Sequence, residues 1–346
     1  MIRPGTIAAV AALALVAPPA WAGPVTVTED GTTSLPALDV PSSALMSPEG
    51  NASRVEHILT ERGLSGRSTA EANAALFGPR LERMKAAYPA VTIRDATLGG
   101  VHVRIYETAG APKAPVLINV HGGGFVGCFA ECGGMESIPV AALTGFRVIS
   151  IDYRLAPAAA FPAASQDVEA VYREVLKATK PERIGLYGCS AGGLLTAQSL
   201  AWFQRKGLPR PAAAGIFCAG GDPAMGGDSR VLGMLLGDGE APRPPTPGGG
   251  PPLGYMRGAA ADDATAYPAR DAATLAKFPP TLVISATRDF AMSSAVSLHA
   301  KLVADGVDAR LHLWEGGRHA FFYDVRVPEA REAYQVMARF FSDRLH

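Results

Sequence analysis

The 346-residue chain lacks the features that mark several protein classes. Its 32 Lys and Arg balance its 32 Asp and Glu, so no basic excess exists for binding nucleic acid or an anionic membrane surface. Charged residues make up only 18% and hydrophobic residues 48%, a composition that excludes an overall disordered chain. After the first residues, no apolar run reaches membrane-spanning length. We therefore expect a soluble protein with no nucleic-acid partner and no stable membrane anchor; a homodimer is compatible with the sequence.

Cysteine is also scarce, with four residues in the chain and none before Cys128. This absence excludes a lipid anchor on the N-terminal cysteine of a processed chain. Neither C-x-x-C nor H-E-x-x-H occurs, so the sequence indicates no metal site, and we expect no metal or cofactor. Cys128 and Cys132 form either a small local disulfide or two buried thiols, because they are only four residues apart. Cys189 and Cys218 lie in apolar surroundings and are expected to be buried and unbridged.

The first residues have the pattern of an export signal. Arg3 precedes the almost entirely apolar run Thr6–Ala17, and Ala20-Trp21-Ala22 has the A-x-A form of a cleavage site. The apolar run is too short to span a bilayer. We therefore expect residues 1–22 to be removed and the product to be exported, either to the periplasm or to the medium.

Glycine and proline are abundant, with 38 and 28 residues, and they interrupt the chain unevenly. About sixty residues, 219–278, separate two expected strands and include the Pro- and Gly-rich stretch 242–252. So long an interruption in a compact domain is usually a functional lid or an irregular loop. The expected organisation is a signal peptide (1–22), a flexible N-terminus (23–45), N-terminal cap helices (46–88), a core (89–218 and 279–346) and a cap or lid insertion (219–278).

After Pro115, short apolar runs of strand length alternate with helical segments. Such alternation is typical of an α/β fold, with a mostly parallel sheet covered by helices on both faces. Earlier in the chain we expect helices over 48–88, broken at 63–66, and a hairpin over 89–107 around Gly99-Gly100. The strands expected next are 116–120, 146–151, 184–187, 213–218, 281–285 and 309–314, and the helices are 166–179, 191–206, 293–305 and 329–345.

The segment Gly188-Cys189-Ser190-Ala191-Gly192 matches G-x-S-x-G between an expected strand and an expected helix. In this motif the serine sits on a sharp strand-to-helix turn, and glycines avoid the clashes that side chains would cause there. The pattern alone is weak, but its position between strand and helix strengthens it. We therefore predict that Ser190 is a nucleophile.

A second Gly-rich segment, His121-Gly122-Gly123-Gly124, directly follows the expected strand 116–120. Consecutive glycines let backbone N–H groups approach a developing oxyanion closely. A simple Gly-rich turn is the alternative. Because Ser190 lies downstream, we favour an oxyanion loop.

A nucleophilic serine needs a base and an acid that orients the base, and in this kind of fold both follow the serine in the chain. Of the four histidines after Ser190, only His319 lies in a loop after an expected strand. The others lie within a helix, within a strand or at the last residue. Asp289 follows the expected strand 281–285 and is predicted to be the acid; Glu315 is its rival but lies only four residues before His319.

Four motifs together resemble one family. They are H-G-G-G-F at 121–125, D-Y-R-L-A-P at 152–157, F-P-A at 161–163 and G-C-S-A-G-G at 188–193. The combination resembles the hormone-sensitive-lipase-like esterases of the α/β-hydrolase fold, over roughly residues 90–345 and the cap helices before them. The family's usual G-D-S-A-G-G has Cys189 in place of Asp here, which removes a carboxylate beside the nucleophile.

The resemblance implies specific roles. Ser190 attacks an ester carbonyl, His319 takes its proton and returns it to the leaving alcohol, and Asp289 orients His319. The resemblance also implies a cap whose apolar face lines the substrate pocket. The oxyanion would be held by the backbone N–H groups of Gly123, Gly124 and Ala191, with His121 and Gly122 completing the oxyanion-loop motif.

The function expected from these residues is an exported serine carboxylesterase that acts on short- to medium-chain esters, with a small-molecule ester as its partner. A deacetylase, a lactonase or an amidase would use the same three residues. A protein that only binds ligands on this fold is a further alternative. It is disfavoured because the sequence keeps every candidate catalytic residue and all the loop glycines.

Overall fold

The computed structural model describes residues 24–110, 114–223, 226–240 and 254–346. The expected signal peptide and the stretch 242–252 lie outside these residues. Among the residues described, no helix is both long and apolar enough to cross a membrane. The chain divides into two units at Pro41. The described part of the first unit contains two short antiparallel strands, β1 (Thr26–Val27) and β2 (Thr33–Ser34).

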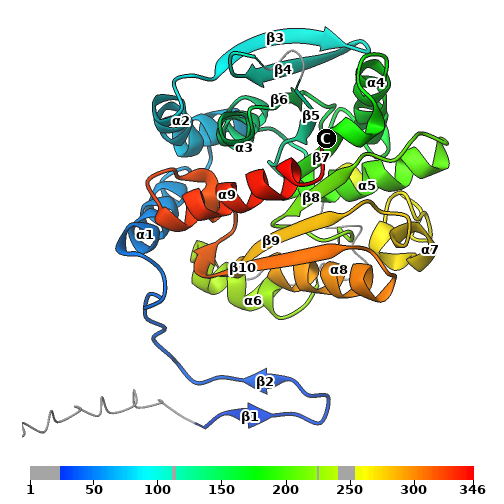
Figure 1. The fold of residues 1–346 in the computed structure, drawn as a ribbon. Coiled ribbons are helices and arrows are strands. Elements are labelled where there is room, and N and C mark those ends of the chain that lie inside the picture. The colour runs from blue at the N-terminus through cyan, green and yellow to red at the C-terminus, as the bar shows by residue number, and fades with distance from the viewer. Residues whose placement is uncertain (1–23, 111–113, 224–225, 241–253) are drawn as a thin grey trace, which may run out of the picture. The chain divides into compact units, whose positions relative to one another are not determined.

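The second unit, Ser42–His346, is built on an eight-stranded sheet with the strand order β10-β9-β8-β7-β5-β6-β4-β3 (Figure 1). The six strands from β10 to β6 run parallel, and β4 and β3 are antiparallel at one edge. The β3–β4 hairpin turns at Gly99-Gly100, as the sequence predicts. The strands are β3 (Thr92–Leu98), β4 (Val101–Glu107), β5 (Val116–Val120), β6 (Arg147–Ile151), β7 (Ile184–Cys189), β8 (Ala213–Phe217), β9 (Thr281–Arg288) and β10 (Ala309–Arg318).

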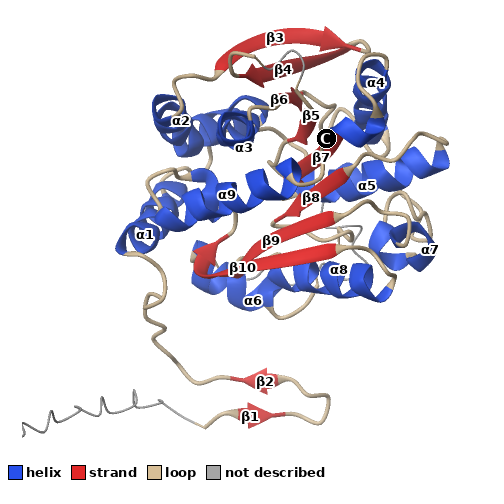
Figure 2. Cartoon of the chain, in the orientation of Figure 1, coloured by secondary structure: helices blue, strands red, loops and turns tan. Residues whose placement is uncertain are grey.

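Both faces of the sheet are buried, which explains why its central strands are continuous apolar runs. In β5, Val116, Ile118 and Val120 face one core, whereas Leu117 faces the other. Helices α4, α5, α7 and α8 cover the first face, and α3 and α9 cover the second, as the layers of Figure 2 show. The sheet is therefore the middle layer of three.

The helices mostly lie where the periodicity predicts them, with ends displaced by a few residues. The described helices are α1 (Pro48–Arg62), α2 (Thr69–Ala87), α3 (Phe129–Thr144), α4 (Ala163–Leu176), α5 (Ala191–Arg205), α6 (Ser229–Gly233), α7 (Ala272–Leu275), α8 (Met292–Ala304) and α9 (Pro328–Ser342). Short helical turns are η2 (Pro181–Arg183), η3 (Met234–Asp238), η4 (Gly254–Met256), η5 (Pro268–Arg270) and η6 (Phe321–Tyr323).

Helix α3 is the one long element that the sequence does not predict. It contains Gly133, Gly134 and Pro139, which have the lowest helix propensities. Tertiary packing overrides this preference, because residues 132–141 of the helix are all buried against the sheet, α2 and α9.

Helices α1 and α2 begin at side-chain caps. Ser47 accepts a hydrogen bond from the N–H of Gly50, and Ser68 and Glu71 form a reciprocal capping box. The loop between the two helices contains the expected break at 63–66. Both helices therefore start and stop for local reasons that the sequence contains.

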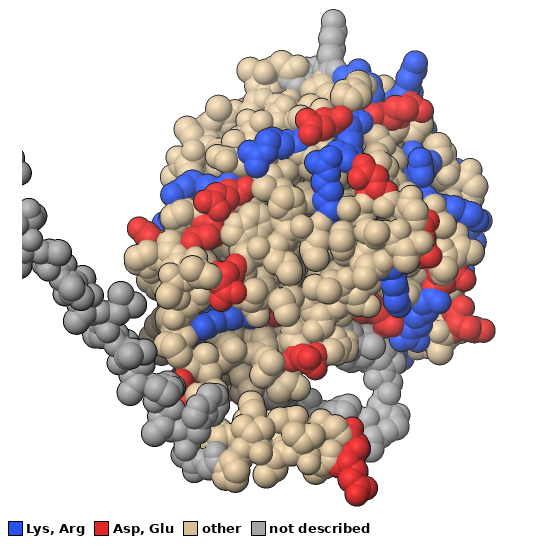
Figure 3. Space-filling view, turned by 60° about the horizontal axis from the view of Figure 1, so that its bottom comes forward, with Lys and Arg blue, Asp and Glu red and all other residues tan. Residues whose placement is uncertain are grey.

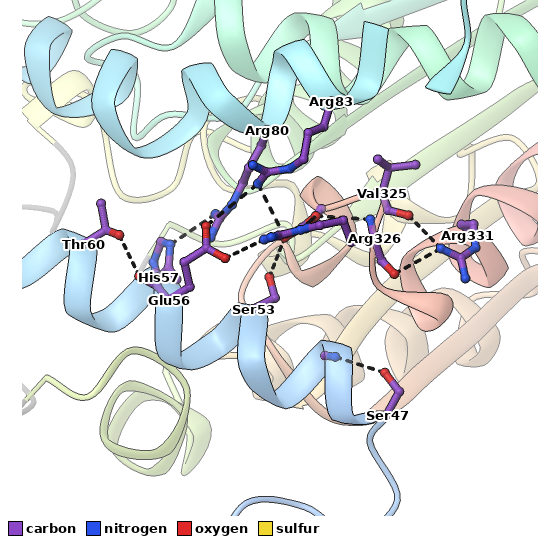
Figure 4. Close-up of polar contacts among 12 residues, drawn as sticks. Ser47, Ser53, Glu56, His57, Thr60, Arg80, Arg83, Val325, Arg326 and Arg331 are labelled. Atoms are coloured by element: carbon purple, nitrogen blue, oxygen red, sulfur yellow. Dashed lines mark hydrogen bonds and ion pairs between the residues drawn. The ribbon is translucent and has the colours of Figure 1, made fainter. Parts of the chain in front are cut away.

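A polar cluster ties these two helices to the chain after β10. We call it the cap clamp, and it consists of Ser53, Glu56, Arg83, Asp324 and Arg326 (Figure 4). The buried carboxylate of Asp324 accepts from Ser53 Oγ at 2.9 Å and from Arg326 at 2.6 Å, and Arg326 also pairs with Glu56. Arg83 of α2 lies 3.8 Å from the same carboxylate. The clamp thus fixes the cap helices to the core.

The insertion 219–278 divides into two parts with different surroundings. In the first part, whose described residues end at 240, α6 packs near β9 and η3 packs near α1 and β9. Residues 254–278 instead enter the core beside α4 and α5, where Tyr255 is fully buried and its hydroxyl accepts from the N–H of Ala164. Of the described residues of the insertion, those of η3 contact the cap helix α1.

Charged side chains of both signs are interspersed on the face shown in Figure 3, among broad uncharged areas. No field of one sign gathers among the residues described on that face. This agrees with the balanced composition of the chain.

Candidate active site

Ser190 stands on a sharp turn between β7 and α5. Its backbone has φ +58° and ψ −122°, which a non-glycine residue adopts only under strain. Its N–H donates to the carbonyl of Phe217 at 2.8 Å, which anchors the turn to β8. The turn leaves Ser190 at the start of α5, where free backbone N–H groups and the helix dipole favour negative charge.

The helix after this turn approaches β5 very closely. A Cβ atom on Gly192 would lie 1.8 Å from the carbonyl oxygen of Val120. Only glycine permits this contact, so the second glycine of the G-x-S-x-G motif is required by packing.

The loop after β5 takes a conformation that glycine favours. Gly123 has φ +110° and Gly124 has φ +64°, and a Cβ on Gly123 would lie 2.3 Å from the carbonyl oxygen of Gly127. Both residues line the same cavity as Ser190 and Ala191. The structure therefore brings together the three residues whose N–H groups are predicted to hold an oxyanion.

His121 does not reach this cavity; it anchors the loop from behind. It is fully buried and stacks on Tyr153, with ring centroids 4.3 Å apart, while the Tyr153 hydroxyl donates to its carbonyl at 2.7 Å. Ala156 donates its N–H to the carbonyl of Phe125 at 2.8 Å. The D-Y-R-L-A-P segment thus braces the loop.

Asp289 and His319 form a hydrogen-bonded pair. Nδ1 of His319 lies 2.7 Å from Oδ1 of Asp289. Asp289 directly follows β9, which is longer than the sequence predicts. The buried carboxylate also accepts from Ser285 Oγ and the N–H of Ala291, both at 2.8 Å. Burial alone would raise the pKa of Asp289, but His319 and these donors outweigh it and hold the pKa below its usual value.

This environment fixes the histidine tautomer. Because Asp289 is ionised, Nδ1 of His319 must carry the proton, which leaves Nε2 as an acceptor. Glu315, the rival acid, accepts instead from Ser43 Oγ at 3.1 Å. The pairing therefore favours Asp289.

Ser190 and His319 line one cavity of about 550 Å³, although they are far apart in the chain. Its apolar wall includes Leu76 and Phe77 of α2 and Met234 of η3. Side chains of α2 and η3 thus line the cavity that contains Ser190 and His319. A volume of this size is typical of pockets for small organic molecules.

The cap also contributes polar groups that sequence reasoning did not identify. His57 of α1 lies in the cavity wall, with Nδ1 3.3 Å from Arg80 and Nε2 3.2 Å from Glu61. Because an arginine only donates, Nδ1 is the acceptor and Nε2 carries the proton. Burial, with the charges of Arg318 and Arg80, lowers the pKa of His57, so it stays neutral.

The candidate disulfide is present. Cys128 and Cys132 are bonded, with their Cα atoms 5.2 Å apart, at the start of α3 and beside Gly123 of the oxyanion loop. Cys189 and Cys218 are free and buried, and burial raises the pKa of both thiols. A buried, protonated thiol is a poor nucleophile, which leaves Ser190 as the candidate.

One group of side chains has the residue types of a metal site. Among the residues described, only Cys218, Asp289 and His319 bring three ligand atoms within 4.8 Å of one another. Asp289 and His319 are already paired with each other, and Asp289 has two further donors. Since the thiol is also buried and protonated, these residues do not fit a metal ion.

Two residues of the site had no sequence signal that we used. Phe290 stacks on His319, and Glu136 of α3 contacts the oxyanion loop. Phe290 could have been found from its position next to the predicted acid. Glu136 could not, because its helix was not expected.

The comparison with known proteins identifies the family of the fold. A family model described as the α/β-hydrolase fold matches residues 117–323, more than half of the chain, so the protein belongs to that family. Within it, the protein is a hormone-sensitive-lipase-like α/β hydrolase. An esterase structure from the bacterial hormone-sensitive lipase family superposes with a TM-score of 0.72 at 26% identity, covering 87% of this chain and 99% of that one.

Two curated relatives are similar in sequence. A versiconal hemiacetal acetate esterase of Emericella nidulans is 34% identical over 119 residues, which are 34% of this chain and 41% of that relative. An acetyl esterase of Salmonella schwarzengrund is 27% identical over 267 residues, which are 74% of this chain and 82% of the relative. The first match thus spans less than half the relative's length. These similarities support a carboxylic-ester hydrolase.

Proposed function

We propose that the protein hydrolyses carboxylic esters through Ser190, His319 and Asp289. The observation that carries the proposal is the Asp289–His319 pair, whose imidazole lines the same cavity as the strained Ser190. Esterase and acetyl-hydrolase relatives support the same reaction.

In this mechanism Nε2 of His319 accepts the Ser190 proton as Oγ attacks the ester carbonyl. The negative charge that develops on the carbonyl oxygen is held by N–H groups of Gly123, Gly124 and Ala191. The protonated imidazole then gives its proton to the leaving alcohol, and an acyl-enzyme remains. Water, activated by His319, hydrolyses that intermediate and restores Ser190.

We further propose short- to medium-chain esters as substrates, because the cavity has a volume of about 550 Å³ and is lined in part by apolar side chains of the cap. Export is also part of the proposal. The Cys128–Cys132 disulfide supports it, since disulfides persist mainly in oxidising compartments. N-terminal sequencing of the protein recovered outside the cytoplasm tests export, with Gly23 as the expected first residue.

The test of catalysis is hydrolysis of p-nitrophenyl esters from acetate to palmitate by the wild type and Ser190→Ala. We expect cleavage of the short esters and a loss of about 10⁶-fold in the variant. Ser199→Ala is the matched control. It removes from the same helix a buried hydroxyl that has no hydrogen-bond partner among the described residues, and it should leave activity unchanged.

A Ser190→Ala activity within tenfold of the wild type would contradict the assignment. A wild type that cleaves no ester but is labelled at Ser190 by a fluorophosphonate would keep the activated serine and reject the substrate class. Absence of both cleavage and labelling would favour a ligand-binding protein.

A further inference from the structure

The side chain of Glu136 lies at the junction of the three segments that form the candidate site. It is buried on α3, and its Oε1 accepts from the N–H of Gly122 in the oxyanion loop at 2.9 Å. The same oxygen accepts from the hydroxyl of Tyr323, four residues after His319. The backbone of Cys189, next to Ser190, also lies near this carboxylate and acts to lower its pKa.

The other carboxylate oxygen is bound as well. Oε2 accepts from Nδ2 of Asn119 at 2.7 Å, and Oδ1 of Asn119 accepts from Ser150 Oγ at 2.8 Å. These two hydrogen bonds fix the orientation of the Asn119 amide, whose NH₂ group must face Glu136. Burial raises the pKa of Glu136 to about 7, and the hydrogen bonds that it accepts oppose this rise. Apart from the Tyr323 hydroxyl, its partners can only donate, so the ionised carboxylate is the form that satisfies them.

The helix turn that carries Glu136 is itself held from outside. Pro139 has no N–H, so the carbonyl of Met135, four residues earlier, loses its helical donor. The hydroxyl of Tyr334 on α9 donates to that carbonyl at 2.9 Å. The hydroxyl of Tyr187 on β7 donates to the carbonyl of Glu136 at 3.0 Å. The proline and the two tyrosines thus set the position of the carboxylate.

We propose that Glu136 is a positioning residue whose carboxylate holds the oxyanion loop, the Ser190 turn and the segment after His319 in one catalytic arrangement. It touches no reacting atom and acts through Gly122, Cys189 and Tyr323. Glu136 supplies a carboxylate near Cys189, the position at which the family's motif usually has an aspartate. The inference rests on the proposed ester hydrolysis for its kinetic consequences only.

The test compares Glu136→Gln with the wild type. The amide keeps the volume, but its NH₂ group must face a donor, so the loop loses at least one charge-assisted hydrogen bond. We expect kcat to fall about tenfold to a hundredfold, with KM changed less than about threefold, because oxyanion contacts act mainly in the transition state. Glu169→Gln is the matched control, since that carboxylate on α4 pairs with Trp202 and Arg173 and should leave kcat unchanged.

A second readout does not depend on turnover. Hydrogen exchange of a peptide that covers residues 121–126 should be at least about tenfold faster in Glu136→Gln than in the wild type or Glu169→Gln, because the N–H of Gly122 loses its charged acceptor. If the glutamine variant does not fold, Tyr323→Phe removes one O–H donor and keeps the ring, and it should produce the same effects more weakly.

The outcomes separate the two proposals. If Glu136→Gln has the kcat and the hydrogen exchange of the wild type while Ser190→Ala is inactive, the role of Glu136 is overturned and the proposed function stands. If the wild type cleaves no ester but hydrogen exchange of residues 121–126 is faster in Glu136→Gln, the positioning role is supported and the proposed reaction is rejected. A general loss of protection across the whole core in Glu136→Gln and Tyr323→Phe alike overturns a local positioning role.

Discussion

The ring of Phe290 stacks on the imidazole of His319, with centroids 4.1 Å apart and planes inclined by 24°. Phe290 directly follows Asp289, so one turn of chain after β9 supplies both the hydrogen bond to Nδ1 and a wall against the ring face. The imidazole is held along its edge and over its face. Rotation out of line with Ser190 is thereby restricted.

The stack should therefore contribute to turnover. A stacked aromatic pair is worth about 0.5–1.5 kcal/mol, which corresponds to about twofold to tenfold in kcat. We expect Phe290→Leu to lower kcat for p-nitrophenyl acetate by that factor, whereas Phe290→Tyr, which keeps the ring, should stay within about twofold. Equal values of kcat in Phe290→Leu and the wild type would show that Asp289 alone orients His319.

The contact between Gly192 and Val120 predicts a large difference between two glycine substitutions. Gly192→Ala places a Cβ 1.8 Å from a backbone oxygen and should cost at least about 3 kcal/mol of unfolding free energy. Gly78→Ala in α2 meets no atom within 4 Å and should stabilise the protein by about 0.5–1 kcal/mol. Urea unfolding measures both, and similar midpoints for the two variants would disprove the close approach.

The disulfide beside the oxyanion loop should support both stability and activity. Removing a bridge that closes so short a loop costs about 2 kcal/mol. Cys128→Ala/Cys132→Ala should therefore unfold at a lower temperature and hydrolyse p-nitrophenyl acetate more slowly than the wild type. In denaturant, thiol titration should find two free thiols before reduction and four after it. Four thiols without reduction would refute the bridge.

The cap clamp predicts an acid-sensitive contribution to stability. Although burial acts to raise it, hydrogen bonds from Arg326 and Ser53 lower the pKa of Asp324 to about 2. Because the pKa is lower in the folded state, the contribution is complete above about pH 4 and is lost as the pH falls towards 2. With screening at the half-exposed Arg326, it amounts to about 1–2 kcal/mol.

Urea unfolding between pH 2 and 6 measures this contribution. The free energy of unfolding should fall more steeply below pH 4 in the wild type than in Asp324→Asn. Asp262→Asn, which changes an exposed carboxylate, serves as the control and should follow the wild type. Parallel curves for the wild type and Asp324→Asn would contradict the assignment.

Much of the fold and of the candidate site could be predicted because the relevant signals are local. Apolar runs of strand length identify β5 and β7, and the residues that follow them identify the two Gly-rich turns. Chain order and position after a strand are sufficient to propose Asp289 and His319. Parallel strands bring such loops to one edge of the sheet, so the prediction needs no distances.

The rest depends on partners that are distant in the chain. Helix α3 is not predicted from the sequence because it contains Gly133, Gly134 and Pro139, which have low helix propensity. Burial between the sheet and α9 outweighs that propensity. Without that helix, the contact between Glu136 and Tyr323, 187 residues apart, has no sequence signal. The spacing of Cys128 and Cys132 does not show whether they are bonded, since geometry decides whether two nearby thiols meet.

The sequence by itself determined the α/β class of the core and the residue types and order of the candidate site. Periodicity and turn chemistry depend only on residues that are close together in the sequence. Only the tertiary structure decided that Asp289 rather than Glu315 pairs with His319 and that Phe290 covers the imidazole. It alone placed the Glu136 carboxylate behind the oxyanion loop. Hydrogen bonds and ring stacking need distances of a few ångströms, and packing sets those distances.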